Sequence, residues 1–267
     1  GYSVAISGNT AIVGARYDDD NGSDSGSAYL FDIVSGAQIA KLLPSDGAIG
    51  DYFGDSVALS DNTAIIGAHR DDDNGLKSGS AYLFDITSGA QTAKLLPSDG
   101  ASDDQFGTSV SISGTTVIVG APFDDDVGLD SGSAYLFDST SGAQFGKLTA
   151  SDGNRDDWFG RTVSIHGEKI IVSAHGDDDN GDNSGSAYIF NAITGAELEK
   201  GAPSDGAAFD YFGSSVAISG DTAIVGAHLD DDNGADSGTA YLFSYCSSHV
   251  ANYCIASPNS ASPSGAP

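Results

Sequence analysis

The chain has 267 residues, 39% of them hydrophobic, so it can bury a sizeable core and is not an intrinsically disordered polypeptide. Its 38 acidic residues against 10 lysines and arginines give a formal charge of −28, which repels nucleic acid and anionic membranes and attracts cations. No apolar run approaches the ~20 residues that a membrane-spanning helix needs. We therefore expect neither a nucleic-acid partner nor insertion into a membrane.

Five copies of one unit of 53 residues, with no insertion or deletion between them, occupy almost the whole chain. The copies begin near residues 1, 54, 107, 160 and 213. A fixed period of about this size is typical of solenoids and propellers, in which each unit buries its apolar faces against its neighbours. Chemistry placed in the repeat is then present about five times, which argues against a single catalytic centre.

The second copy, residues 54–106, predicts four short strands. They cover residues 56–60, 63–68, 80–85 and about 91–96. The first two are joined by Asp61-Asn62, a connection that suits a tight hairpin. An acidic loop joins the second to the third. The turn after residue 86 leads to the fourth strand, which a Pro-Ser-Asp-Gly segment closes.

Side chains alternate in the predicted third strand, because successive residues of a strand point to opposite faces. Tyr82 and Phe84 share one face, and Ala81 and Leu83 share the other. No stretch shows an apolar period of 3.6 over the length that a helix needs. Four antiparallel strands per unit predict an all-β fold, a β-propeller whose blades stack around an axis. A parallel β-helix is the main rival, but its coils are shorter and do not use two-residue hairpins.

Three recurring motifs carry a resemblance to a known family. Phe106-Gly107, Gly120-Ala121-Pro122 and the segment 132–137, Gly-Ser-Ala-Tyr-Leu-Phe, resemble the FG-GAP repeat of integrin α-subunit propellers and their bacterial relatives. The resemblance covers residues 1–244 and implies an extracellular propeller used in adhesion or protein interaction.

The sequence departs from the integrin-type repeat at one place. That repeat carries a calcium loop between its first and second strands, whereas this chain has only a hairpin there. The family's calcium site is therefore not transferred. The acidic residues lie instead in the connection between the second and third strands.

The acidic loops are the candidate metal sites, because calcium takes about 6–8 oxygens from carboxylates, amides and carbonyls. Adjacent carboxylates about 4 Å apart repel by roughly 4 kcal/mol at an effective dielectric of 20, and a bound cation relieves this. The alternative is a solvated turn, since Asp, Asn and Gly are ordinary turn residues. Val127 replaces the asparagine in the third copy, whose site we expect to be weaker or absent. The candidate calcium ligands are Asp18, Asp19, Asp20 and Asn21; Asp71, Asp72, Asp73 and Asn74; Asp124, Asp125 and Asp126; Asp177, Asp178, Asp179 and Asn180; and Asp230, Asp231, Asp232 and Asn233.

A second acidic set lies in the loop that joins each fourth strand to the next blade. Strand alternation places this loop on the same face of the disc as the Asp triplets. The set comprises Asp46, Asp51, Asp99, Asp104, Asp152, Asp157, Asp205 and Asp210. Tyr52, Trp158 and Tyr211 adjoin it and could stack on a sugar or a partner. With Asp51, Asp104, Asp157 and Asp210 they form the candidate ligand face. The alternative, which the sequence favours, is that the aromatic residues pack the loop onto the neighbouring blade.

Other candidate sites are weaker. His69, His175 and His228 occupy one repeat position and could bind a transition metal, but Arg16 and Pro122 fill the same position in other copies. A loop site that tolerates different residues explains this better. No Ser/His/Asp set is unique to one place, and no glycine-rich phosphate loop precedes a helix, so we predict no enzyme.

The segment 245–267 departs from the repeat. Cys246 and Cys254 are the only cysteines, and we predict a small disulfide loop and an oxidising compartment; the alternative is two free thiols. The rest resembles a linker. The fifth repeat has no fourth strand of its own type, so we expect that strand to come from residues 245–256, from upstream sequence or from a neighbouring molecule. Whether five blades close the ring stays open.

Together these patterns predict a secreted or cell-surface adhesion module stabilised by calcium, with an extracellular protein or a polysaccharide as its partner. The first alternative is a structural subunit that assembles with copies of itself into a filament by strand or tail exchange. The second is a carbohydrate-binding propeller.

Overall fold

The computed structural model describes residues 1–232 and 234–244, which form nineteen β-strands and no helix. The first two blades contain β1 (Ser3–Ser7), β2 (Thr10–Ala15), β3 (Ser27–Asp32), β4 (Gln38–Leu42), β5 (Ser56–Ser60), β6 (Thr63–Ala68), β7 (Ser80–Asp85) and β8 (Ala90–Leu95). The third and fourth contain β9 (Ser109–Ser113), β10 (Thr116–Ala121), β11 (Ser133–Asp138), β12 (Gln144–Leu148), β13 (Phe159–His166), β14 (Lys169–Ala174), β15 (Ser186–Asn191) and β16 (Glu197–Gly201). The fifth contains β17 (Phe212–Ser219), β18 (Thr222–Ala227) and β19 (Thr239–Ser244).

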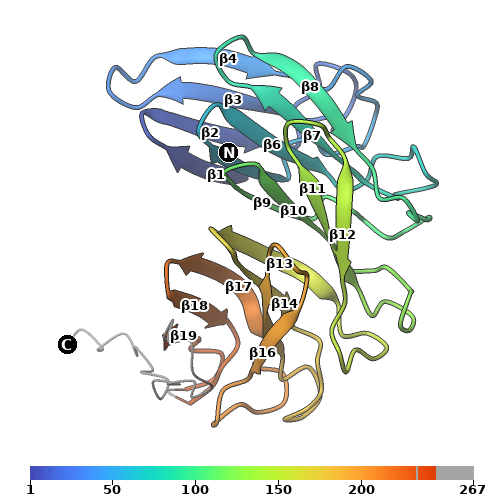
Figure 1. The fold of residues 1–267 in the computed structure, drawn as a ribbon, viewed down its shortest axis with the longest axis vertical. Helices are drawn as coiled ribbons and strands as arrows, with labels where there is room; N and C mark the ends of the chain where they lie inside the picture. The colour runs from blue at the N-terminus through green and yellow to red at the C-terminus, as the bar shows by residue number, and fades with distance from the viewer. Residues whose placement is uncertain (233, 245–267) are drawn as a thin grey trace.

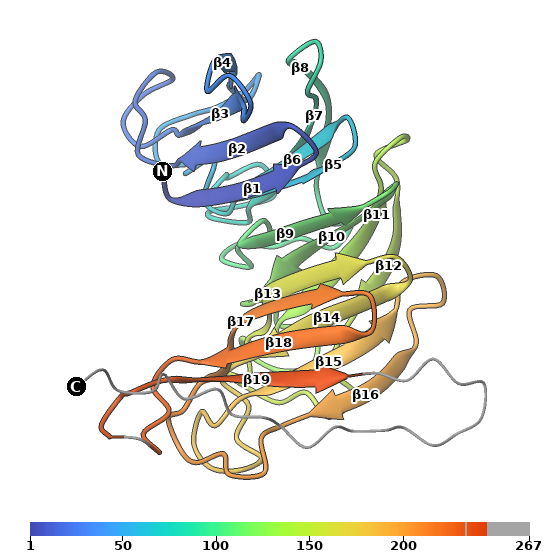
Figure 2. The same ribbon diagram turned by 90° about the vertical axis from the view of Figure 1, so that its left-hand side faces the viewer.

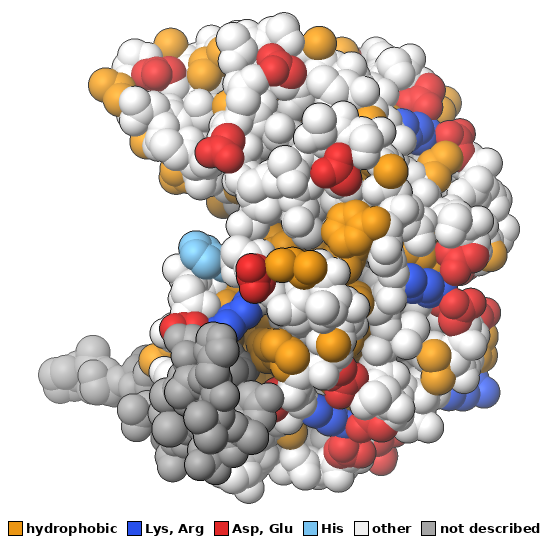
Figure 3. Space-filling model, viewed as in Figure 1, with side chains coloured by type: hydrophobic (Ala, Val, Ile, Leu, Met, Phe, Trp, Pro, Cys, Tyr) orange, Lys and Arg blue, Asp and Glu red, His pale blue; other side chains and the backbone are white. Residues whose placement is uncertain are grey.

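Each repeat is one antiparallel sheet in which the strands follow chain order. The first four sheets have four strands and the fifth has three described strands, ending at β19. The first strands of successive sheets contact one another, β1 with β5, β5 with β9, β9 with β13 and β13 with β17. The five blades therefore form an arc around the line of first strands, with the first and fifth blades at its two ends (Figures 1 and 2). The molecule is hollowed on the inner side of this arc (Figure 3).

The predicted all-β propeller with four-stranded blades is confirmed. Three strands of the second blade have the predicted bounds, and the fourth, β8, begins and ends one residue earlier than predicted. The hairpin at Asp61-Asn62 also forms, with Ser60 paired to Thr63 and Asp61 at a φ of 50°. The two cysteines and the tail from residue 245 lie outside the described residues, so the predicted disulfide stays a prediction.

The hydrophobic core lies between blades, because facing sheets of neighbouring blades bury apolar side chains against each other. Tyr82 and Phe84 of the second blade join a cluster with Ile12 and Leu30 of the first. Leu83, on the opposite face of the same strand, joins the cluster formed with the third blade. The alternation expected from the sequence is thus confirmed.

The Phe-Gly pair at the start of the second to fifth repeats joins two blades. Phe53 is fully buried, and its ring contacts the edges of Tyr82 and Phe84 at centroid distances of 5.4 and 5.9 Å. Its backbone N–H donates to the carbonyl of Ser25 in the preceding blade at 3.0 Å. Gly54 follows with a φ of 90°, and a Cβ there would lie 2.4 Å from the carbonyl oxygen of Ser27. The close approach of two backbones explains why glycine recurs at this position.

Candidate functional site

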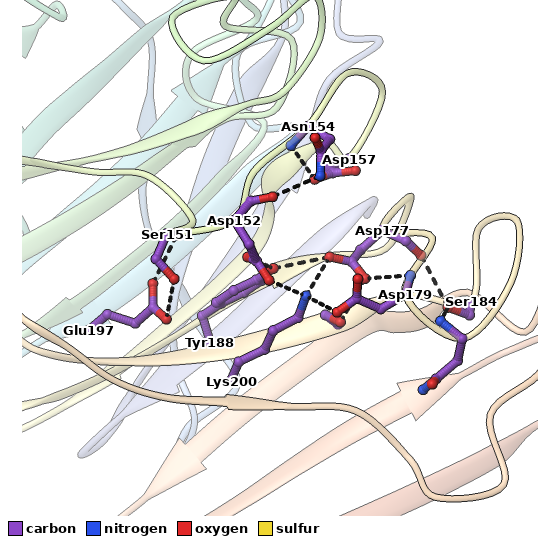
Figure 4. A network of polar contacts seen from close by, with 12 residues as sticks. Ser151, Asp152, Asn154, Asp157, Asp177, Asp179, Ser184, Tyr188, Glu197 and Lys200 are labelled. Carbon is purple, nitrogen blue, oxygen red and sulfur yellow. Dashed lines mark hydrogen bonds and ion pairs between the residues drawn. The ribbon is translucent and has the colours of Figure 1, made fainter.

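The Asp triplets form five acidic clusters at the junctions of the blades. Each cluster takes the first and third Asp of one triplet and the tyrosine of that blade's third strand. From the second cluster on, an Asp from the loop that ends the preceding blade joins them. The fourth, acidic cluster 4, contains Asp152, Asp177, Asp179, Tyr188 and Lys200 (Figure 4).

A lysine ammonium lies at the centre of acidic cluster 4. Lys200 Nζ is 2.7 Å from Asp152, 2.9 Å from Asp177 and 2.6 Å from Asp179, measured to carboxylate oxygens. The Tyr188 hydroxyl lies 2.9 Å from Asp152 and 3.1 Å from Asp177, and shares its proton between them. The lysine thus provides the positive charge that the sequence led us to expect from a metal ion.

Acidic cluster 4 is also where carboxylates meet closely enough for a metal. Asp152, Asp177 and Asp179 each offer an oxygen, and these oxygens lie within 4.8 Å of one another. Asp177 is buried, whereas Asp152 and Asp179 are exposed. The donor set suits a hard cation, but a cation at its centre would have to displace Lys200.

The lysine also lowers the pKa of Asp152. Partial burial opposes ionisation of Asp152, but hydrogen bonds from Lys200 and Tyr188 outweigh it and keep the pKa of this carboxyl below its usual value. Burial by itself would lower the pKa of Lys200, but its hydrogen bonds to the three carboxylates raise that pKa. Asp152 and Lys200 therefore both carry their charges at neutral pH.

The same arrangement recurs in the other repeats with one exception. The ammonium groups of Lys41, Lys94 and Lys147 contact the first and third Asp of their own triplets in clusters 1 to 3. Tyr241 of the fifth cluster lies 2.7 Å from Asp230 and 3.3 Å from Asp205. The residue at the lysine's place in the fifth repeat is Tyr253, so this repeat brings no lysine of its own. Negative charge on Asp230 accordingly raises the pKa of Asp232. Along one outer edge of the molecule, basic side chains lie among carboxylates (Figure 3).

The remaining residues of each triplet loop hold the loop in shape. Asp178 accepts a hydrogen bond from the backbone N–H of Asn183 at 2.7 Å, and the N–H of Asn180 donates to Ser184 Oγ at 3.1 Å. In the third repeat, Val127 makes the same backbone contact with Ser131 Oγ at 3.3 Å. The loop therefore keeps its fold without the asparagine side chain, as expected for turn residues.

The Asp residues of the candidate ligand face are buried within their loops. Asp51, Asp104, Asp157 and Asp210 are 3–5% exposed, and each accepts the backbone N–H three residues before it. Burial, aided by nearby acidic groups, raises the pKa of Asp157 to about 6 against the opposing hydrogen bond from the Asn154 backbone. These carboxyls shape the loop and do not present themselves to a ligand in solvent.

The aromatic residues of that face pack against the histidines with their rings tilted. The Trp158 and His175 ring centroids are 5.1 Å apart, and the His175 and Tyr211 centroids are 5.6 Å apart. Tyr52 packs in the same way between Tyr17 and His69. These contacts support the expected loop packing and give the three histidines a shared role as ring partners.

A cavity opens beside this row of rings, at the start of the first strands. We call it the axial cavity; it measures about 320 Å³ and is lined by Tyr2, Arg16, Asp55, His69, Gln105, Thr108, Phe123, Trp158, Arg161 and His175. One repeat position contributes a different residue to the lining in each of four successive copies: Tyr2, Asp55, Thr108 and Arg161.

Sequence reasoning missed the lysines and the axial cavity. The lysines had a signal, since they recur in the repeat register in four copies. The only sequence feature that marked the cavity was a repeat position at which the copies differ. By contrast, the first Asp of the triplet and the third-strand tyrosine are the same in all five copies.

The fold and these sites define a β-propeller whose repeated residues join the blades. Comparison with family models finds the FG-GAP repeat five times, over residues 1–31, 37–84, 90–137, 143–190 and 197–243. The chain therefore belongs to the FG-GAP repeat family, which confirms the resemblance seen in the sequence. Comparison with curated proteins gave no match. Such repeats are typical of integrin-like interaction modules. None of the described residues forms a helix with the length and apolarity to cross a membrane.

Proposed function

We propose that this protein is an extracellular, non-catalytic adhesion or interaction module that binds its partner at the axial cavity. The proposal rests on one observation: residues that join the blades are the same in every repeat, whereas residues that line the axial cavity differ between repeats. The first Asp of the triplet and the third-strand tyrosine hold the blades together and are the same in every copy. The cavity instead collects unlike residues from four repeats, which gives a symmetric scaffold one asymmetric, specific surface.

A solid-phase binding assay tests this function. The immobilised propeller is offered a panel of extracellular matrix proteins and polysaccharides, and its binding is compared with that of Trp158→Ala and of Leu76→Ala. Leu76 is 59% exposed and does not line the cavity, so it controls for loss of an apolar side chain. We expect saturable binding that the Trp158 variant loses and the Leu76 variant keeps. Equal binding by both variants would place the interaction elsewhere.

Calcium belongs to the same proposal, and we assign it first to the fifth cluster. Asp205, Asp230 and Asp232 supply carboxylates without a lysine from their own repeat, so a cation there has no ammonium to displace. When bound, calcium would neutralise this cluster and stabilise the last blade. Any ligand that binds only the native state raises its stability. Melting curves in millimolar calcium and in chelator test this proposal. Asp230→Asn should abolish the calcium-dependent rise in melting temperature, and Asp177→Asn should not. Identical curves for the unaltered protein under the two conditions would refute calcium binding.

Self-assembly is a second candidate, favoured by one observation. Within the described residues the fifth sheet ends at β19, whereas the other four sheets have a fourth strand. An edge strand can pair with a strand of another chain, and repeated head-to-tail donation gives filaments. Light scattering after size exclusion, with and without residues 245–267, tests this candidate, because a concentration-independent monomer in both forms excludes it.

A further inference from the structure

We propose that the axial cavity binds a carboxylate-bearing sugar, a uronic acid unit, with Arg161 facing the carboxylate. This inference rests on the proposed binding function and names the chemistry of the ligand. Its basis is an exposed arginine, Arg161, that lines the cavity together with aromatic and polar side chains.

Several nitrogen atoms of residues that line the cavity are shielded from solvent and have no hydrogen-bond partner among the described residues. They are Arg16 Nε, Trp158 Nε1 and His175 Nδ1. The His69 Nδ1 atom also makes no well-aligned hydrogen bond, although it lies 3.1 Å from Asp55 Oδ2. Buried donors without acceptors are rare in folded proteins and destabilise them. These atoms lie behind the cavity wall, so the choice of ligand rests on the side chains that are exposed to the cavity, Arg161 above all.

The charge of the cavity favours an anionic ligand. Two of the chain's 10 basic residues, Arg16 and Arg161, line it. Among the described residues of the lining Asp55 is the only acidic one, and Arg16 already neutralises it through an ion pair of 2.6 Å. The Arg161 side chain is exposed toward the cavity and forms no ion pair among the described residues. Guanidinium groups bind carboxylates through two parallel hydrogen bonds, which makes a carboxylate the best match.

The remaining lining residues favour a sugar ring over a small inorganic anion. Tyr2, Phe123 and Trp158 supply aromatic surface, and Gln105 and Thr108 supply groups that pair with hydroxyls. A volume of about 320 Å³ lies within the range of pockets that hold organic ligands. An inorganic anion would leave this aromatic surface unused.

Tryptophan fluorescence reads this cavity directly, because Trp158 is the only tryptophan of the chain. The purified protein is titrated with sodium glucuronate, with glucose and with N-acetyl-aspartate amide. We expect a saturable change with glucuronate and none with glucose at the same concentrations. The Arg161→Gln variant should bind glucuronate roughly 10- to 100-fold more weakly, as expected for the loss of a charge-assisted contact. Lys77→Gln, which removes the same charge outside the lining, should bind as the unaltered protein does.

The outcomes separate this inference from the proposed function. Equal responses to glucose and glucuronate, equal affinities of the two charge variants, or no response to any sugar would overturn the uronate assignment. Binding of the aspartate derivative alone would identify an acidic peptide as the ligand instead. If Trp158→Ala abolishes surface binding while glucuronate gives no response, the interaction module stands and only the uronate inference fails. Circular dichroism of Arg161→Gln confirms that the variant is folded.

Discussion

Replacing Lys200 with Met tests whether an ammonium group holds acidic cluster 4 together. Methionine keeps the apolar length of the side chain and removes only its charge and hydrogen bonds. In the structure the ammonium contacts three carboxylates, of which Asp177 has a side chain only 5% exposed. Asp152 and Asp179 are 45% and 62% exposed at their side chains, so water stabilises them when the lysine is gone.

The magnitude follows from that difference in exposure. Removing one partner of a buried ion pair destabilises a protein by about 3–5 kcal/mol, whereas exposed pairs contribute about 0–1 kcal/mol. Asp177 keeps its hydrogen bonds from Tyr188 and from Ser186 Oγ, which reduces the loss. We therefore expect Lys200→Met to lower the free energy of unfolding by about 2–4 kcal/mol. For a domain of this size that corresponds to a fall in melting temperature of roughly 5–15 °C.

Thermal and urea unfolding at pH 7 measure the effect, with Lys77→Met as the matched control. Lys77 lies 3.8 Å from Asp103, and both side chains are exposed, so its loss should change stability by less than about 1 kcal/mol. Without the lysine, which lowers the pKa of Asp152, this carboxyl should bind protons more tightly, so the deficit of the variant should shrink as the pH falls toward 5. Millimolar calcium should restore part of the lost stability, since three carboxylates then face an empty centre. Equal melting temperatures for the two variants would refute the role given to the lysines.

Three further predictions follow from the packing and the titratable groups. The buried carboxyls of Asp51, Asp104 and Asp157, whose pKa values burial raises to about 6, bind protons more tightly when folded, so stability should increase as the pH falls from 7 to 5. Burial lowers the pKa of His175 to about 4, so this histidine destabilises the folded state as the pH falls and offsets part of the gain. The free energy of unfolding, measured by urea titration, should still rise by about 2 kcal/mol between pH 7 and pH 5. A fall over this range would contradict the raised pKa values of the three buried carboxyls. Phe106→Ala should cost about 3–5 kcal/mol of unfolding free energy, because the ring is fully buried between blades, and a loss below 1 kcal/mol would show that the blades close around the gap. Gly107→Ala should destabilise the protein more than Gly114→Ala. A Cβ at residue 107 would lie 2.4 Å from the Ser80 carbonyl oxygen, whereas a Cβ at residue 114 would meet nothing within 4 Å. Equal melting temperatures of the two variants would contradict this steric explanation.

The sequence by itself determined the architecture, because the information was local and repeated. Two-residue hairpins and the alternation around Tyr82 specify antiparallel strands, and five copies in one register leave little room for another fold. Strand alternation also placed the Asp triplets and the preceding blade's loop on one face, which the shared contacts of Lys200 with Asp152 and Asp177 bear out.

Only the tertiary structure showed which groups neutralise the negative charge of the acidic loops. It alone also showed where the residues that differ between the repeats come together. Lys200 follows the Asp177 triplet by more than twenty residues and reaches it only because β16 pairs with β15 beside the acidic loop. Asp157 is buried within its loop and does not face a ligand in solvent. No local sequence pattern indicates this burial. Tyr2, Thr108 and Arg161 lie far apart in the chain and line one cavity because the curvature of the arc brings the first strands together.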